Sequence, residues 1–390
     1  MPPRSPKIQP RRKFPLTISL RTYLNEAQAA GTELGIGLTV DQCTYLLLRI
    51  AEDLGQRQRL VNPGPAEITE FFTAADPATL AVVGRDAYEM EELFDELVRL
   101  VPNADIYFHC LSALQKRRLK YARILQYQPI PTILQVGPRG LLQYGSLSSR
   151  ALSAFMFWRK WMFDIDNRAG QETGYVFEPI VVRSIGGTPA SAKTSPVRRR
   201  LNPEKGRQVD CILDGRAYEI KLRITIAASG QGRWGEEKDF PADCVASGYV
   251  PVLIVFDDTQ ADKLDELKAI FEDAGGEVFV GEAAWQHLEE LSGETIAVFV
   301  EKYVRAPLAE LLAEAPARDT LPDLSIKQMP DKIIITIDGE ELSINRPKDM
   351  RGAAEVAGED ADALDALAQE QNAPQNLTST QLGLGFEAAG

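Results

Sequence analysis

Histidine and cysteine are scarce in this chain, and their scarcity excludes several kinds of site. Only 2 of the 390 residues are histidines and 4 are cysteines. Cys43, Cys110, Cys211 and Cys244 lie far apart and include no Cys-x-x-Cys pair, so the sequence indicates neither a zinc site nor a disulfide framework. Zinc hydrolase chemistry therefore lacks its usual ligands, and reduced cysteines fit a cytoplasmic protein.

Long apolar runs are absent as well. The sequence contains no stretch of transmembrane length, and residues 1–15 are basic without the apolar segment of a signal peptide. We therefore expect a cytoplasmic protein with no membrane partner. A chain of 390 residues is long enough to bury a sizeable core and to form two folded units.

The net charge of −13 argues against a nucleic-acid-binding protein until its distribution is considered. Residues 306–390 contain 16 acidic and 6 basic residues, a net charge of −10, so the other 305 residues carry only −3. Basic side chains are concentrated at 4–13, 116–123 and 193–207. Because local patches determine contact with phosphates, nucleic acid stays a candidate partner.

One segment, residues 209–221, combines a predicted β-hairpin with a set of charged side chains. Asp214-Gly215 separates two apolar-rich runs, and this dipeptide is a strong hairpin signal because both turn residues tolerate positive φ. Side chains alternate along a strand, so Glu219 and Lys221 share one face. The turn brings the strand ends together and places Asp210 beside them.

Asp210, Glu219 and Lys221 fit the chemistry of phosphodiester hydrolysis. Mg²⁺ prefers hard oxygen ligands and keeps several waters, so the two carboxylates, helped by the Ile220 carbonyl, predict a magnesium site. Lys221 beside it can orient the attacking water or deprotonate it, because a partly buried lysine can shift its pKa downward.

The Glu-x-Lys string alone is a weak motif, and it recurs at 236–238 and 266–268. The first copy lies in a polar, Gly-rich segment, and the second in an amphipathic helix, where residues two apart do not face each other. Only the copy at Glu219 and Lys221 follows a strand that carries an acid, Asp210, and a hairpin turn. The alternative for them is an edge hairpin with ordinary surface charges.

These residues resemble the motif of the PD-(D/E)xK nuclease superfamily, which includes most Type II restriction endonucleases. Asp210 matches the first acid and Glu219-Ile220-Lys221 matches E-x-K, whereas Val209 stands in place of the proline. The resemblance implies a further glutamate on a preceding helix, for which Glu178 is the candidate and Glu172 the alternative.

The order of the elements predicts an α/β fold. Residues 249–256 form a nearly continuous apolar run, as in a strand buried on both faces. A helix over 260–274, a strand over 277–280 and a helix over 283–291 follow. This alternation predicts a core with a mixed central sheet flanked by helices. The resemblance implies that the metal site lies at one edge of such a core.

The remaining segments predict a helical N-terminal region and a short C-terminal extension. Residues 39–42 form a capping box before a helix that ends at Gly55, and 87–101 and 104–127 read as two further helices. The basic stripe of 104–127 either contacts phosphate or is solvated. We expect a basic flexible arm at 1–14, a helical region for DNA contact or dimerisation at 15–150, the nuclease core at 151–306, a small hairpin extension around Asp338-Gly339 at 307–350, and an acidic disordered tail at 351–390. The aromatic-rich residues 155–163 favour core or a dimer interface over base stacking.

Residues 187–194 imitate a phosphate-binding P-loop, but two departures argue against one. Ala192 occupies a position that requires glycine, and Pro189 removes a backbone amide. We therefore expect no nucleotide cofactor. We predict instead a mobile loop whose basic side chains grip DNA phosphates, namely Lys193, Arg198, Arg199 and Arg200.

Residues 229–238 are expected to form a flexible loop after the second strand of the hairpin. Arginine can bind guanine, and glutamine adenine, through paired hydrogen bonds, so Arg233 and Gln231 are the predicted base readers. The alternative is a surface loop without DNA contact. Arg223 shares a strand face with Lys221 and is a candidate phosphate contact.

The resemblance extends over about residues 159–304, and residues 174–256 are also similar to the ApaLI-like group of restriction enzymes. It implies a Mg²⁺-dependent Type II site-specific deoxyribonuclease of a restriction-modification system. Such an enzyme cuts double-stranded DNA at a short palindrome and acts as a homodimer. Two alternatives stay open: a structure-specific or repair nuclease of the same superfamily, and a DNA-binding protein that does not cut.

Overall fold

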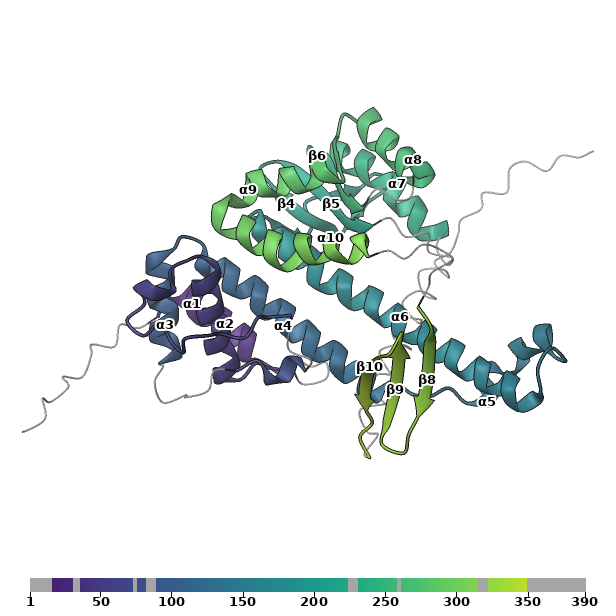
Figure 1. Cartoon of the computed structure of the whole chain (residues 1–390). Helices are drawn as coiled ribbons and strands as arrows, with labels where there is room; N and C mark the ends of the chain where they lie inside the picture. The colour runs from purple at the N-terminus through teal and green to yellow at the C-terminus, as the bar shows by residue number, and fades with distance from the viewer. Residues whose placement is uncertain are drawn as a thin grey trace, which may run out of the picture.

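The computed structural model of this chain describes residues 16–30, 36–72, 76–81, 89–223, 231–257, 261–314 and 322–348. Figure 1 shows an α/β core, a group of N-terminal helices and a separate small sheet, with the long helix α6 (Ser149–Ser184) running past them. The predicted fold class, α/β with a mixed central sheet flanked by helices, is confirmed. In the described part of the chain, none of the helices is both long and apolar enough to cross a membrane.

The central sheet has five strands in the order β1-β4-β5-β6-β7. They span Thr188–Ala190, Val209–Leu213, Arg216–Arg223, Val250–Asp257 and Glu277–Val280. β1, β4 and β5 pair antiparallel, whereas β5, β6 and β7 pair parallel, which makes the sheet mixed. Helices α7 (Gln231–Ala246) and α8 (Ala261–Asp273) provide the crossovers that parallel strands need.

The predicted hairpin of β4 and β5 is confirmed. Cys211 pairs with Tyr218 and Leu213 with Arg216, so the turn consists of Asp214-Gly215. The two turn residues have φ values of +47° and +78°. Asp-Gly adopts this conformation readily, which is why so short a signal in the sequence fixes the register of the strands.

Strand β6 lies at the centre of the core, and residues 251–256 are all buried, as the apolar run predicts. On one face of the sheet, Val252 and Ile254 pack with side chains of α6 and α9 (Glu282–Val300). On the other face, Leu253 and Val255 pack with side chains of α7 and α8. The sheet is therefore covered by helices on both sides (Figure 1).

The N-terminal region is helical, as predicted. It consists of α1 (Ile18–Gln28), α2 (Val40–Asp53), η1 (Arg57–Arg59), η2 (Pro77–Thr79), α3 (Met90–Leu100) and α4 (Ala104–Tyr127). The capping box before α2 is confirmed, because the Thr39 hydroxyl accepts the Gln42 amide hydrogen at 3.1 Å and the Gln42 side chain accepts that of Thr39 at 3.0 Å. Helix α4 has the predicted bounds.

The basic side chains of α4 serve packing inside the protein. Arg117 and the buried Lys120 pair with Glu172 of α6 at 2.8 and 2.9 Å. Arg118 donates to the Phe71 carbonyl at 2.8 Å and lies over the Phe71 ring. Both readings of this stripe, phosphate contact or a solvated face, are therefore wrong for these three residues.

Two short helices, α5 (Ile133–Val136) and η4 (Gly137–Gln143), lead into α6. The aromatic-rich stretch at 155–163 falls inside α6 and is only partly core. Trp161 is buried and packs against Ile333, whereas Phe155 is 44% exposed.

After α9, the chain continues through the π-helical segment η5 (Glu301–Arg305) into α10 (Ala306–Ala313). β8 (Leu324–Gln328), β9 (Lys332–Ile337) and β10 (Glu340–Asn345) then form an antiparallel sheet. The predicted hairpin around Asp338-Gly339 is confirmed, and β8 adds a strand that the sequence did not indicate. The expected basic arm and acidic tail lie outside the described residues.

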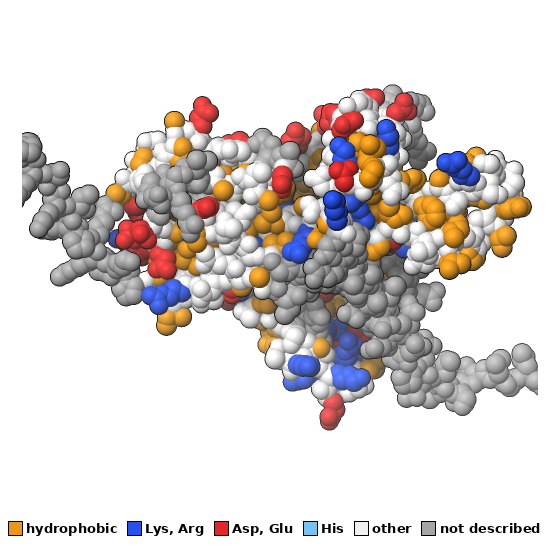
Figure 2. Space-filling model, turned by 90° about the horizontal axis from the view of Figure 1, so that it is seen from below, with side chains coloured by type: hydrophobic (Ala, Val, Ile, Leu, Met, Phe, Trp, Pro, Cys, Tyr) orange, Lys and Arg blue, Asp and Glu red, His pale blue; other side chains and the backbone are white. Residues whose placement is uncertain are grey.

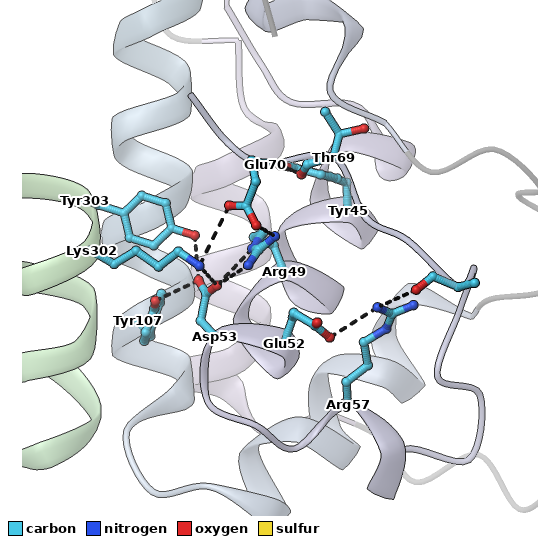
Figure 3. A network of polar contacts seen from close by, with 11 residues as sticks. Tyr45, Arg49, Glu52, Asp53, Arg57, Thr69, Glu70, Tyr107, Lys302 and Tyr303 are labelled. Atoms are coloured by element: carbon cyan, nitrogen blue, oxygen red, sulfur yellow. Dashed lines mark hydrogen bonds and ion pairs between the residues drawn. The ribbon is translucent and has the colours of Figure 1, made fainter. Parts of the chain in front are cut away.

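A buried ion network ties the N-terminal helices to η5 (Figure 3). The Asp53 carboxylate is fully buried and pairs with Arg49 at 2.8 Å and Lys302 at 2.6 Å. It also accepts hydrogen bonds from the hydroxyls of Tyr107 at 2.9 Å and Tyr303 at 2.5 Å. Burial, together with the Asp53 charge, raises the pKa of both tyrosines, so they stay protonated as donors.

We predict that Asp53→Ala lowers the free energy of unfolding by about 3–5 kcal/mol, because the buried Arg49 guanidinium would lose the fully buried one of its two carboxylate partners. Urea denaturation followed by circular dichroism measures this change. The matched control is Glu70→Ala, since Glu70 also pairs with Arg49 but is 55% exposed, and its removal should lower the free energy by less than about 1 kcal/mol. Equal losses in the two variants would contradict the prediction.

Candidate active site

Asp210 lies on β4 at the end of the hairpin opposite the turn. Its Oδ2 accepts a hydrogen bond from the backbone amide of Ile220 at 2.9 Å. The carboxylate is therefore held against β5 by the backbone of that strand, beside Glu219 and Lys221. The structure brings together the three residues that the sequence predicts for the site.

Glu219 and Lys221 share one face of β5, as the alternation of the strand predicts. Lys221 Nζ lies 2.9 Å from Glu219 Oε1 and 3.0 Å from Glu237 Oε1 of α7. The Lys221 side chain is only 15% exposed, and both carboxylates are comparably shielded. The Lys221 ammonium is thus largely shielded from solvent and is bound between one carboxylate on β5 and one on α7.

The pKa of Lys221 is raised, which corrects the predicted downward shift. Burial disfavours the ammonium form, but the charges and hydrogen bonds of Glu219 and Glu237 together outweigh burial. Lys221 is therefore a protonated donor in this arrangement. It can orient a water or a phosphate oxygen, but it has no lone pair with which to deprotonate one.

The pKa of Asp210 is raised well above its usual range. Burial is the main cause, and the negative charges of Glu219 and Glu178 add to it. The Ile220 amide and Lys221 act in the opposite direction. Carboxylates from β4, β5 and α6 thus act on one another at the end of the hairpin opposite its turn.

Of the two glutamates on α6, only Glu178 contributes to the electrostatics of Asp210. Glu172 is 5% exposed and is held by Arg117 at 2.8 Å and Lys120 at 2.9 Å. Its carboxylate therefore holds α4 against α6. The ion pairs of Glu172 with α4 and the effect of the Glu178 charge on Asp210 favour Glu178 over the alternative, Glu172, as the helix glutamate of the site.

The donor set fits a hard divalent cation. Asp210 and Glu219 offer carboxylate oxygens, Ile220 offers a backbone carbonyl, and the like charges that raise the Asp210 pKa would be balanced by a cation. Within the ranges that the structure describes, no group of three or more His, Cys, Asp or Glu side chains has metal-binding geometry. A cation at the two carboxylates would complete its shell with backbone, water and substrate oxygens.

Glu237 is the residue of the site that the sequence reasoning missed. The sequence predicts a flexible loop at 229–238, but α7 begins at Gln231, so that prediction is wrong from residue 231 onward. The signal in the sequence is the acidic pair Glu236-Glu237, one helical turn before the buried Phe240 and two turns before the buried Cys244. The side chains of Gln231, Arg233 and Arg223 lie outside the described residues, so their predicted DNA contacts stay predictions.

The segment with the predicted phosphate-gripping residues is a docked pair of short strands. β2 (Arg198–Arg199) pairs with β3 (Asn202–Gly206). Arg199 pairs with Glu236 of α7 at 2.5 Å, and the backbone amide of Arg200 donates to Asp243 at 2.7 Å. The expected mobile loop is therefore wrong for 198–206, although Lys193, Arg198 and Arg200 are exposed.

The segment that imitates a P-loop forms β1 and a turn. Its Gly187 has a packing role, because a Cβ at this position would lie 2.0 Å from the sulfur of Cys211. The glycine lets β1 begin directly against β4.

Comparison with known proteins adds independent evidence. Residues 74–305, which contain the whole candidate site, match the family model described as ApaLI-like restriction endonuclease. The chain is 41% identical over 339 residues to the Type II restriction enzyme ApaLI of Acetobacter pasteurianus, and the alignment covers 82% of this chain and 90% of that protein. No solved structure matches.

We predict that Glu172→Gln lowers the free energy of unfolding by about 3 kcal/mol, because the buried Lys120 ammonium would lose the carboxylate charge that lies 2.9 Å from it. Glu178→Gln is the matched control on the same helix. It removes a charge that opposes ionisation of Asp210, so the loss of free energy should be smaller than for Glu172→Gln. Urea denaturation of both variants makes the comparison, and a larger loss for Glu178→Gln would show the assignment to be reversed.

Proposed function

Because this chain belongs to the ApaLI-like restriction endonuclease family, and is thus a site-specific restriction endonuclease, we propose how its own residues carry out the reaction. The proposed enzyme hydrolyses phosphodiester bonds of double-stranded DNA with Mg²⁺, at a short palindromic sequence. It acts as a cytoplasmic homodimer within a restriction-modification system. Its catalytic core is a PD-(D/E)xK core formed by the β4–β5 hairpin and the helices around it.

The observation that carries the proposal is the meeting of Asp210, Glu219 and Lys221 on the neighbouring strands β4 and β5, at the end of the hairpin opposite the turn. The hydrogen bond from Ile220 holds the first acid, and the ion pair of 2.9 Å holds the second beside the lysine. Glu178 approaches the same site from α6. The residues that match the restriction endonuclease family include all four of these site residues. No observation favours the two alternatives, a structure-specific or repair nuclease and a DNA-binding protein that does not cut.

Asp210 and Glu219, with the Ile220 carbonyl, would hold Mg²⁺, which supplies Lewis acidity toward a phosphate and lowers the pKa of a bound water. Lys221 donates hydrogen bonds from its ammonium and so orients the attacking water or a phosphate oxygen. The raised pKa of Lys221 keeps that donor charged at neutral pH. Glu178 would add a carboxylate to a second metal or its water shell.

Exposed basic side chains near the site supply the contacts to the DNA backbone. Lys193, Arg198 and Arg200 project from the segment that docks on α7, the helix that also carries Glu237. Phosphate contacts position the duplex and are sensitive to salt, whereas base contacts read the sequence. We propose Gln231 and Arg233, at the start of α7, as base readers and Arg223 as a further phosphate contact.

We predict that Lys221→Ala lowers the cleavage rate by at least about 100-fold, because the attacking group would lose its oriented donor. Digestion of a long, unmodified phage DNA with Mg²⁺ measures the effect, and wild-type protein should give sharp bands. DNA binding in the absence of Mg²⁺ should be preserved.

The Mg²⁺-free digest of the wild-type protein is the control and should show no products. Cleavage by Lys221→Ala at the normal rate would refute the role of the lysine. A smear in place of bands from the wild-type protein would argue against cutting at a defined sequence.

Glu237 is a positioning residue in this proposal, because it touches Lys221 and not the reacting atoms. We predict that Glu237→Gln lowers kcat by roughly 10-fold with little change in KM for DNA, since a charge-assisted hydrogen bond to Lys221 weakens. The adjacent Glu236 is the matched control, because it pairs with Arg199 and Arg207 instead. Glu236→Gln should change KM or stability and leave kcat in place, whereas equal kcat losses would argue against positioning by Glu237.

A further inference from the structure

One end of the molecule is a projecting apolar arm, defined here as residues 133–158. It consists of α5, η4 and the first turns of α6, and it extends beyond the core and the small sheet (Figure 1). Large apolar side chains on it are exposed, with Leu134 at 87% and Leu142 at 93% exposure. Leu141, Tyr144, Leu147 and Phe155 are exposed on the same arm.

The arm has an ordered fold of its own. Val136, Leu152 and Met156 are buried in a small cluster that packs α5 and η4 onto the start of α6. Gly140 also lies close to Leu152, because a Cβ there would be 3.8 Å from the leucine. The outward-facing leucines therefore sit on a folded surface, and contiguous apolar surface of this kind on a soluble protein marks an interaction site.

The composition of the arm is that of an interface. Between residues 133 and 158, Arg139 and Arg150 are the only charged residues, whereas charged residues make up 25% of the whole chain. Figure 2 shows the projecting end, on the right, covered by apolar and uncharged atoms, with a basic group and no acidic one in view. Depletion of charge with retention of leucine and aromatic side chains is typical of the buried centre of a protein–protein interface.

We propose that the arm binds a second copy of this chain and forms the main contact of the homodimer. The inference deepens the proposed function and rests on its homodimer. Of the 26 residues of the arm, 4 are buried and 22 are at least partly exposed, and a standard interface uses about 20–30 residues on each partner. A two-fold interface sets the same residues of both copies near one another, and a surface almost without charge can do so without repulsion.

The same observations disfavour DNA as the occupant. Protein surfaces that bind DNA are strongly basic, because each contact neutralises a phosphate. Two arginines among 26 residues give the arm a lower density of basic charge than residues 193–207, where 6 of 15 residues are basic. The arm also lies at the start of α6, whereas Glu178 of the candidate site lies near its end.

The test is sedimentation of the full chain without DNA over a range of concentrations, for the wild-type protein and for the double variant Leu134→Glu/Leu142→Glu. The wild type should be dimeric, and the variant should show a rise in the dimer Kd of at least about 100-fold, because two desolvated anchors become charges. Leu311→Glu is the matched control, since Leu311 is 73% exposed on α10 outside the arm, and it should stay dimeric. All three substituted leucines lie on the surface, so the unfolding midpoint of both variants should equal that of the wild type.

A wild-type protein that stays monomeric at every concentration, with and without DNA, would overturn the proposal. Dimers of unchanged affinity in the double variant would overturn it too, by placing the interface elsewhere. If the wild type is monomeric and the double variant no longer binds DNA, the arm is a DNA-binding surface instead of a dimer interface. Because sedimentation needs no cleavage, a dimer that cuts no DNA would contradict the proposed function and leave the arm interface standing.

Discussion

The binding of one ammonium between two carboxylates is the interaction on which the arrangement of the site depends. Lys221 lies about equally far from Glu219 on its own strand and Glu237 on α7, so the charge balance couples the central strand β5 to a helix on one face of the sheet. Without the lysine, acids from β4, β5, α6 and α7 would face one another under low exposure. The site therefore has an excess of negative charge, which a bound cation or the protonated Lys221 ammonium would stabilise.

Helix α6 contacts the N-terminal helices, the central sheet and the small C-terminal sheet. At 36 residues it is about 54 Å long, and it carries the arm at its start, Trp161 against the small sheet, Glu172 against α4 and Glu178 near Asp210. These contacts point in different directions along a single rigid element.

The sequence allowed correct prediction wherever the signal was local. Asp214-Gly215 set the hairpin, the Thr39–Gln42 box set the start of α2, and the apolar run set β6. The wrong predictions concern features that depend on residues distant in sequence. Helix α7 contains Gly232, Gly235 and Pro241 and reads as a loop, but burial of Phe240 and Cys244 against the sheet stabilises it as a helix. The direction of the Lys221 pKa shift and the pairing of the α4 basic residues likewise depend on partners 16 and about 50 residues away.

The buried Asp53 network has a consequence for the order in which the protein can be completed during synthesis. Two of the four partners of Asp53 come from η5, and Tyr303 follows Asp53 by 250 residues. A ribosome that adds about 5–20 residues per second needs roughly 13–50 s to make that stretch. Until then, the N-terminal helices hold an acid whose counter-charges are incomplete. The N-terminal helices and η5 therefore reach their final packing together, only when most of the polypeptide has left the ribosome.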